Sequence, residues 1–419
     1  MAVTTQLPAA FPLGSRLDER GVLELGGCDA LELAREHGTP AFVVSEDDLR
    51  ARARELVAAY RARTPHAEVV FAAKAFPCTA VLRVFAEEGL GCDVASGGEL
   101  ALALAAGMEP GRIHLHGNAK SEAELRAAVD AGIGHVVVDN VADVDKLERI
   151  LGAGRTQRVQ LRVTPDVWGE THAAVSTGQA DSKFGVALDQ APALIARLRV
   201  SDSLELVGLH FHVGSQLLDV TPYLRAVEAT AALGDFPVVN VGGGLGVTYT
   251  DERPPTVEEY VAAKVDAVER FHGPGRTIVD EPGRALVANS TVTLYTVESV
   301  KRNVSTWVAV DGGMSDNLRP MLYGARYEVH VVDRFGPGDT VCHVAGKHCE
   351  SGDVLARDVV LADPRPGDVL VTPATGAYGH SMASNYNGVP RPPVVFVKDG
   401  SSRVVVRRET YEDLLARDV

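Results

Sequence analysis

The sequence predicts an α/β protein in which a (β/α)8 TIM-type barrel is combined with a mostly antiparallel β-barrel or β-sandwich domain. Between residues 69 and 284, eight short apolar segments alternate with mostly amphipathic ones, which is the rhythm of eight strands and their connecting helices. After residue 284 the apolar segments become short and rich in β-branched residues, and Gly, Pro and Asp separate them, as in antiparallel sheets. A doubly wound open sheet is the alternative fold, but the glycine fingerprint that usually follows its first strand is missing.

The individual elements follow from these patterns in chain order. A helix is expected at Asp29–His37, where the apolar residues share one face and Gly38 ends the pattern, and a strand is expected at 41–45. The eight barrel strands are expected at Val69–Lys74, Gly91–Ser96, Ile113–Gly117, His135–Asn140, Gln160–Pro165, Val207–Gly214, Val238–Gly244 and Thr277–Gly283. The later strands are expected at Val292–Val300, Thr306–Asp311, Thr340–Ala345, Val354–Val360, Val369–Pro373, Pro393–Lys398 and Arg403–Arg408. We therefore expect three parts: residues 1–38, whose strands join the β domain; 39–288, the barrel; and 289–419, the C-terminal β domain.

The composition limits the classes of function. A formal net charge of −15 argues against a nucleic-acid partner, because binding phosphate backbones calls for a basic surface. No apolar run is long enough to cross a bilayer, and the first residues lack the basic start and apolar core of a signal peptide. A cytoplasmic protein without a membrane partner is expected. Five cysteines without CxxC spacing argue against a disulfide framework and against a zinc ribbon.

Chemically useful residues gather where the predicted barrel strands end, which is where barrels of this kind carry their active sites. Lys74 closes the first strand, and an amine desolvated there would be a nucleophile. A glycine-rich turn at 242–246 follows the seventh strand and Glu281-Pro282-Gly283-Arg284 follows the eighth, the region where such barrels bind phosphate. An amine, a phosphate cradle and a carboxylate for a ring nitrogen are what pyridoxal 5'-phosphate requires. In isolation, Lys74 could equally end its strand and reach water.

Ten motifs carry a resemblance to a known family. They are FAAKAF at 71–76, DVASGGEL at 93–100, HGNAKS at 116–121, SKFG at 182–185, HFHVGSQ at 210–216, VGGGLG at 241–246, EPGR at 281–284, DGGMSDNLRPMLYGARY at 311–327, KHCESGD at 347–353 and GAYGHSMASNYNG at 376–388. On these motifs, which run over nearly the whole chain, the sequence resembles the fold-type III, alanine-racemase-like pyridoxal-phosphate decarboxylases. Among them it is similar to those that convert meso-2,6-diaminopimelate to L-lysine and carbon dioxide, the last step of lysine biosynthesis. The alternative is a related decarboxylase of another basic amino acid or a carboxylated polyamine.

The resemblance also implies roles for individual residues. Lys74 would form a Schiff base with the cofactor, His212 would stack on its ring, and Glu281 would bind its pyridine nitrogen. The other residues expected to bind the cofactor are Asp93, Ser215, Gly243, Gly244, Gly283, Arg284 and Tyr378. The residues expected to bind the substrate are Arg284, Arg319 and Tyr323 at its distal carboxylate, Glu350 at its distal ammonium, and also Tyr378. Cys349 would return a proton after carbon dioxide leaves. In this family the Cys-Glu pair comes from the partner subunit, which implies a homodimer with shared active sites.

Several other interpretations remain open at this point. The doublets His114/His116 and His210/His212 resemble those of metal-dependent hydrolases, although no metal is expected because this interpretation leaves the glycine turn and CESGD unexplained. A cofactor-binding regulatory protein is also conceivable, although it would need no proton donor. Cys349 could be a small buried hydrophobe, and His210 a satisfied core histidine. The family's usual HGNNKS is HGNAKS here, with Ala119 in place of a polar residue.

Overall fold

The protein is described by a computed structural model, which covers residues 7–167, 182–336 and 338–419. Among these residues, no helix is both long enough and apolar enough to span a membrane. The chain divides into two compact units, one built around residues 50–246 and 253–286, and one built from residues 1–49, 247–252 and 287–419. The domain limits expected from the sequence remain a prediction.

The first unit is a closed barrel of eight parallel strands. Its strands are β5 (Ala67–Ala72), β6 (Gly91–Val94), β7 (Ile113–Leu115), β8 (His135–Val138), β9 (Gln157–Thr164), β11 (Leu204–His210), β12 (Val238–Asn240) and β13 (Thr277–Asp280). Each strand pairs in parallel with the next one in the order β5, β6, β7, β8, β9, β11, β12 and β13. The last strand, β13, pairs with β5, so the ring closes. The short β10 (Val186–Ala187) pairs with β9 outside the ring. All eight barrel strands were predicted from the sequence.

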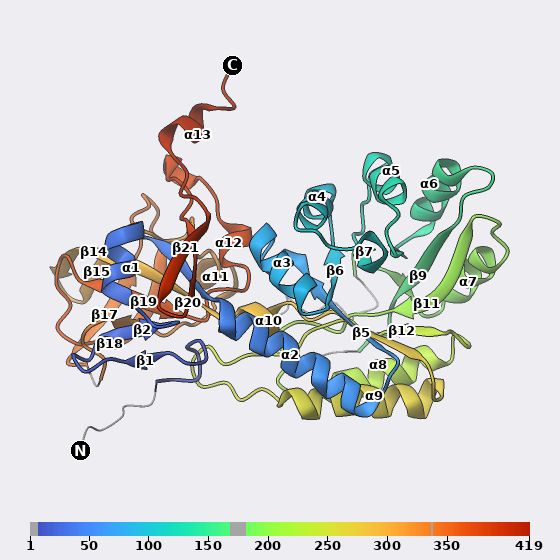
Figure 1. Cartoon of the computed structure of the whole chain (residues 1–419), viewed down its shortest axis with the longest axis horizontal. Helices are drawn as coiled ribbons and strands as arrows, with labels where there is room; N and C mark the ends of the chain where they lie inside the picture. The colour runs from blue at the N-terminus through green and yellow to red at the C-terminus, as the bar shows by residue number, and fades with distance from the viewer. Residues whose placement is uncertain (1–6, 168–181, 337) are drawn as a thin grey trace. The chain divides into compact units, whose positions relative to one another are not determined.

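Helices lie outside the barrel strands (Figure 1). They are α2 (Glu46–Arg63), which begins in the other unit, α3 (Thr79–Glu87), α4 (Gly97–Ala105), α5 (Glu122–Ala131), α6 (Val141–Leu151), α7 (Ala191–Arg199), α8 (Thr221–Ala231), α9 (Val257–His272) and α10 (Arg284–Val287). Local sequence fixes several of their ends. A capping box of Ser121 with Glu124 starts α5, and Gly132 ends it in the left-handed conformation that glycine adopts without strain. A second box, Thr256 with Glu259, starts α9.

The second unit is built on a mostly antiparallel sheet in the order β18-β17-β15-β14-β4-β20-β21, with β19 also paired to β14 and β16 paired to β19. Its strands are β4 (Ala41–Ser45), β14 (Thr291–Arg302), β15 (Thr306–Val310), β16 (His330–Val331), β17 (Thr340–Ala345), β18 (Val354–Leu361), β19 (Val369–Pro373), β20 (Val394–Lys398) and β21 (Ser401–Val406). β1 (Arg16–Leu17), β2 (Leu23–Leu25) and β3 (Cys28–Asp29) form a small separate sheet. The helices of this unit are α1 (Ala30–His37), α11 (Arg319–Tyr323), α12 (Gly379–Met382) and α13 (Tyr411–Leu415).

Two apolar clusters form the core of the second unit. One contains Phe11 and Leu23 from the N-terminal segment together with Val43, Val292 and Val397, and the other is centred on Tyr295, Val308 and Cys342. Residues of the N-terminal segment therefore pack with residues of the C-terminal strands. A TIM-type barrel combined with a mostly antiparallel sheet confirms the predicted fold class.

Candidate active site

The polar residues predicted at the strand ends lie mainly in the loops that follow the barrel strands. β5 ends at Ala72, and Lys74 belongs to a short 3-10 turn (Ala73–Ala75) that comes next. The strand was predicted to run to Lys74 but ends two residues earlier, and Lys74 is exposed. The role of Lys74 remains a prediction. The Phe76 N–H donates to the Ala73 carbonyl over 2.9 Å, which turns the chain and leaves Lys74 exposed between two buried alanines.

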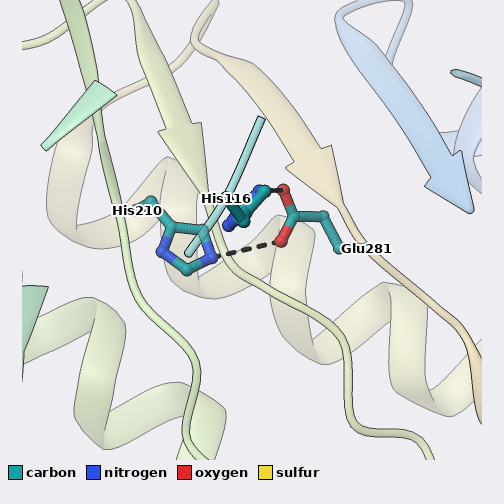
Figure 2. Close-up of side chains that lie close together, drawn as sticks. All are labelled: His116, His210 and Glu281. Carbon is teal, nitrogen blue, oxygen red and sulfur yellow. Dashed lines mark hydrogen bonds and ion pairs between the residues drawn. The ribbon is translucent and has the colours of Figure 1, made fainter. Parts of the chain in front are cut away.

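Glu281 is the centre of a buried hydrogen-bond network at this end of the barrel (Figure 2). Its Oε1 accepts hydrogen bonds from His116 Nε2 at 2.9 Å and Asn240 Nδ2 at 2.7 Å, and its Oε2 accepts one from His210 Nε2 at 3.1 Å. The four residues come from different places in the sequence: Glu281 follows β13, His116 follows β7, His210 ends β11 and Asn240 ends β12. Asp93, at the end of β6, is buried with its Oδ1 3.7 Å from His116 Nε2.

The network keeps Glu281 ionised and its histidine partner neutral. Burial alone would raise the pKa of Glu281, but electrostatic attraction to His116 and the hydrogen bonds from the facing histidines hold that pKa well below its usual range. Burial lowers the pKa of His210 to about 3, so this imidazole is neutral near pH 7 and donates its one N–H to Glu281. Burial, together with the nearby Lys74 ammonium, also places the pKa of His212 well below its usual value. The site therefore presents the Glu281 carboxylate to the neutral ring of His210.

The glycine turn after β12 is packed too tightly for any side chain. A Cβ on Gly243 would lie 2.0 Å from the Glu281 carbonyl oxygen, and one on Gly244 would lie 2.5 Å from the Gly214 carbonyl oxygen. Gly242 and Gly244 have φ angles of 58° and 125°, in the region that only glycine adopts readily. Close by in the chain fold, Arg284 Nη2 donates to the Ser215 hydroxyl over 2.9 Å. Backbone amides, a hydroxyl and a buried guanidinium form a donor set suited to a phosphate group.

Gly283 and Arg284 complete the barrel part of the site. A Cβ on Gly283 would lie 3.2 Å from the Cβ of Ala72 and 3.1 Å from that of Ala75, so the loop after β13 packs directly against the turn that carries Lys74. The Ala72 N–H also donates to the Pro282 carbonyl over 3.0 Å. The loop after β13 and the turn that carries Lys74 are thus held together by direct contacts.

In the second unit, Arg319 is a buried cation facing tyrosines. It begins α11, is 6 % exposed, and donates from Nη1 to the Tyr327 hydroxyl. Its guanidinium carbon lies 4.9 Å from the ring centre of Tyr249. Burial opposes the charge, but the tyrosine oxygens outweigh it and raise the pKa of Arg319. Its Nε is buried without a hydrogen-bond partner among the described residues, which leaves a donor available to an added carboxylate.

The other residues predicted to bind substrate lie in the same unit. Tyr323 ends α11 and is half-buried. Tyr378 is half-buried and stands before α12 with a φ angle of 67°. This left-handed conformation is uncommon for a residue with a bulky side chain and places Tyr378 among the strained positions that often accompany function.

Cys349 and Glu350 are both exposed, on the loop between β17 and β18. The Cys349 N–H donates to Asn387 Oδ1 over 3.0 Å. The buried Asp353 fixes the loop, accepting from the N–H groups of His348 at 2.9 Å and Met314 at 2.7 Å. The interpretation of Cys349 as a small buried hydrophobe is therefore wrong, whereas Cys342 does lie in the core.

Sequence reasoning did not predict the part that His116 and Asn240 play around Glu281. His116 stood out only as half of a His-x-His doublet, and Asn240 did not stand out at all. The signal for Asn240 is a polar residue at the buried end of an apolar strand, two residues before the glycine turn, where such a group needs a partner.

The barrel residues fit pyridoxal phosphate: an exposed amine, a buried anion, and a cradle of close-packed glycines beside a hydroxyl and a guanidinium. The donors of His116, His210 and Glu281 also lie within 4.8 Å of one another, and these residue types bind metal ions. Here both histidine nitrogens instead donate to the carboxylate. The absence of a metal, expected from the sequence, remains a prediction.

Known proteins resemble this chain over nearly its full length. Residues 47–288 match the family model of the pyridoxal-dependent decarboxylase, pyridoxal binding domain. The chain is 50% identical to the diaminopimelate decarboxylase of Actinosynnema pretiosum subsp. auranticum, over 98% of this chain and 95% of that protein. It is 45% identical to that of Mycobacterium tuberculosis, over 98% of both. The solved diaminopimelate decarboxylase of M. jannaschii in co-complex with L-lysine is 32% identical over 97% of both chains, with a TM-score of 0.91.

Proposed function

The chain belongs to the diaminopimelate decarboxylase family of pyridoxal-dependent decarboxylases, and we propose on this basis that it converts meso-2,6-diaminopimelate to L-lysine and carbon dioxide. The observation that carries the proposal is identity of 40–50% over nearly the full length of relatives named for this reaction. Its cofactor is pyridoxal 5'-phosphate. The relative solved with L-lysine supports an amino-acid ligand for this fold.

When bound, the cofactor supplies a protonated ring that takes up the electron pair left by departing carbon dioxide. The barrel residues hold and tune that ring. Lys74 would hold the cofactor through its amine, His212 would cover one ring face, and Glu281 would receive the ring N–H. Gly243, Gly244, Gly283 and Ser215 would bind the phosphate, and Arg284 would hold Ser215 in place. Because His116, His210 and Asn240 already donate to Glu281, its carboxylate is oriented before the cofactor arrives.

Residues of the second unit would select the substrate and return the proton. The buried Arg319 offers a planar set of donors with an unpartnered Nε, which suits the substrate's distal carboxylate. Tyr323 and Tyr378 would support this contact, and Glu350 would pair with the distal ammonium. The Cys349 thiol would donate the proton that replaces the lost carboxylate.

We further propose that the protein is a homodimer in which Cys349 and Glu350 serve the partner's barrel. A mixing experiment tests this. Lys74→Ala and Cys349→Ala homodimers should each be inactive, whereas a one-to-one mixture, unfolded and refolded together, should regain about a quarter of wild-type activity by statistical pairing. Failure of the mixture to regain activity, with both variants folded, would contradict shared sites. Cytoplasmic location is expected as well and can be tested by fractionating the source cells.

The test of substrate is a panel of amino acids. Carbon dioxide and L-lysine should form in equal amounts from meso-2,6-diaminopimelate, while ornithine, arginine and a carboxylated polyamine should react at least about 100-fold more slowly, because none offers a second carboxylate to Arg319. Faster turnover of ornithine or arginine than of meso-2,6-diaminopimelate would move the protein to the related class of decarboxylases.

A further inference from the structure

A second charged network, centred on Lys264 and Asp280, lies next to the glycine turn. Lys264 on α9 and Asp280 at the end of β13 are both 0 % exposed, and their Nζ and Oδ1 atoms lie 2.7 Å apart. Lys264 Nζ also donates to the hydroxyl of Tyr260, which in turn donates to Asp280 Oδ1 over 2.8 Å. The ammonium lies 4.4 Å from the ring centre of Tyr223 and 4.1 Å from that of Tyr260. The Lys264 ammonium is thus surrounded by the Asp280 carboxylate and the side chains of the two tyrosines.

The third donor of Lys264 leads to the proposed cofactor site. Lys264 Nζ donates to the Gly242 carbonyl over 2.9 Å, and the same carbonyl accepts the Glu281 N–H at 3.2 Å. The Gly242 carbonyl oxygen therefore accepts hydrogen bonds from both the buried Lys264 ammonium and the main-chain N–H of Glu281. It links Lys264 to the first glycine of the turn and to the residue whose carboxylate is proposed to face the ring nitrogen. The Tyr223 hydroxyl lies 3.4 Å from the next carbonyl, that of Gly243.

The glycine turn has no room to adjust if this contact is lost. A Cβ on Gly242 would lie 2.9 Å from the His212 Nδ1 atom and 2.5 Å from the Phe211 carbonyl oxygen. The turn is thus held between the segment that follows β11 on one side and the loop after β13 on the other. A carbonyl at such a position must keep its direction, because rotating its peptide would also rotate the N–H of Gly243.

Folding stability alone does not account for this pair. Burying an ammonium and a carboxylate costs desolvation energy that their attraction only partly returns, so an uncharged pair of the same volume is often as stable or more stable. Burial lowers the pKa of Lys264, and the carboxylates of Asp280 and, more weakly, Glu281 oppose that shift. The Lys264 ammonium costs desolvation energy and donates one of its hydrogen bonds to the glycine turn. A role in orienting that turn explains this arrangement better.

We propose that Lys264 is a positioning residue that, through the Gly242 carbonyl, fixes the glycine turn for the cofactor's phosphate. The inference rests on the proposed function, since it assigns the turn to that phosphate. If Lys264 acts in this way, its loss should weaken the contribution of the phosphate group to cofactor binding and leave binding of the ring and aldehyde part unchanged.

The experiment compares pyridoxal 5'-phosphate with pyridoxal, which lacks the phosphate. The test variant is the double substitution Lys264→Met with Asp280→Asn, which removes both buried charges at nearly constant volume and so avoids leaving one unpaired. Apo protein is titrated with each compound and binding is followed by absorbance. The matched control is Lys120→Met with Asp143→Asn, another buried pair with 2.7 Å between its charged atoms, placed after β7 and away from the glycine turn.

The expected result is a Kd for pyridoxal 5'-phosphate raised at least about 10-fold in the test variant, with the Kd for pyridoxal changed less than about 2-fold. The control should leave the ratio of the two constants as in the wild type. Equal weakening of both compounds, or no change in either, would overturn the proposal, because a merely structural role predicts no phosphate dependence. A wild-type protein that binds neither compound would instead refute the proposed function. Circular dichroism confirms that each variant is folded.

Discussion

Replacing Glu281 by Gln removes the negative charge at the centre of the barrel network with almost no change in shape. An ion pair at a hydrogen-bond distance of about 3 Å, in an effective dielectric of about 20, is worth about 5 kcal/mol. The amide dipole of Gln retains part of that, so a loss of about 3–4 kcal/mol is expected, which corresponds to about 100- to 1,000-fold in kcat. The physical reason is that a neutral amide cannot keep a pyridine nitrogen protonated.

The structure also predicts that this variant folds. A Gln oxygen at the position of Oε1 keeps the donors of His116 and Asn240, and its NH2 group then faces His210 Nε2. His210 can accept that hydrogen bond by moving its proton to Nδ1, which has no hydrogen-bond partner among the described residues. The cost is one unsatisfied N–H, about 1–3 kcal/mol.

The assay for this variant is release of carbon dioxide from meso-2,6-diaminopimelate at saturating cofactor, with thermal melting to confirm folding. Glu205→Gln is the matched control, because Glu205 is an exposed glutamate on β11 of the same barrel and should leave kcat unchanged. A folded Glu281→Gln enzyme with kcat within about 3-fold of wild type would refute the electrostatic reasoning.

Three further predictions follow from the same structure. Arg319→Lys keeps the charge but loses the planar donor set, so KM for meso-2,6-diaminopimelate should rise about 30- to 100-fold with cofactor affinity unchanged, while Arg326→Lys at an exposed site should change neither. Cys349→Ala should lower kcat by about 100-fold or more without lowering the melting temperature, whereas Cys342→Ala in the core should lower stability by about 1 kcal/mol and leave kcat unchanged. Burial lowers the pKa of His135 to about 3, so the neutral, folded form of this residue is fully favoured above about pH 6.5 and the free energy of unfolding falls as the pH drops toward 3. His135→Gln should therefore remove up to about 1.4 kcal/mol per pH unit from the slope of the unfolding free energy against pH in that range.

The architecture could be predicted from the sequence because its signals are local. Alternating apolar strands and amphipathic helices mark a barrel, and all eight strands appear in the structure with ends shifted by only a few residues. The shifts have functional consequences: Lys74 was placed inside its strand, but the strand ends at Ala72 and a 3-10 turn exposes the lysine. Strand periodicity does not reveal where one backbone hydrogen bond redirects the chain.

The partners of the site residues could not be predicted, because they come together only when the barrel closes. Nothing in the sequence near Glu281 indicates that His116, 165 positions away, donates to it. Lys264 looks like an ordinary polar residue of an amphipathic helix, yet it is fully buried. A helical pattern that tolerates one lysine does not say whether the amine reaches water or a carboxylate.

We propose that this barrel binds pyridoxal phosphate through Lys74 and decarboxylates meso-2,6-diaminopimelate. A visible absorbance spectrum of the purified protein before and after this substrate is added, with L-lysine and carbon dioxide quantified in the same sample, tests both parts of the proposal together. We expect a cofactor band in the wild type that changes on mixing while both products form in equal amounts, and no such band in a washed Lys74→Ala variant. A protein that shows no band after incubation with the cofactor, or a band with no lysine formed, would contradict it.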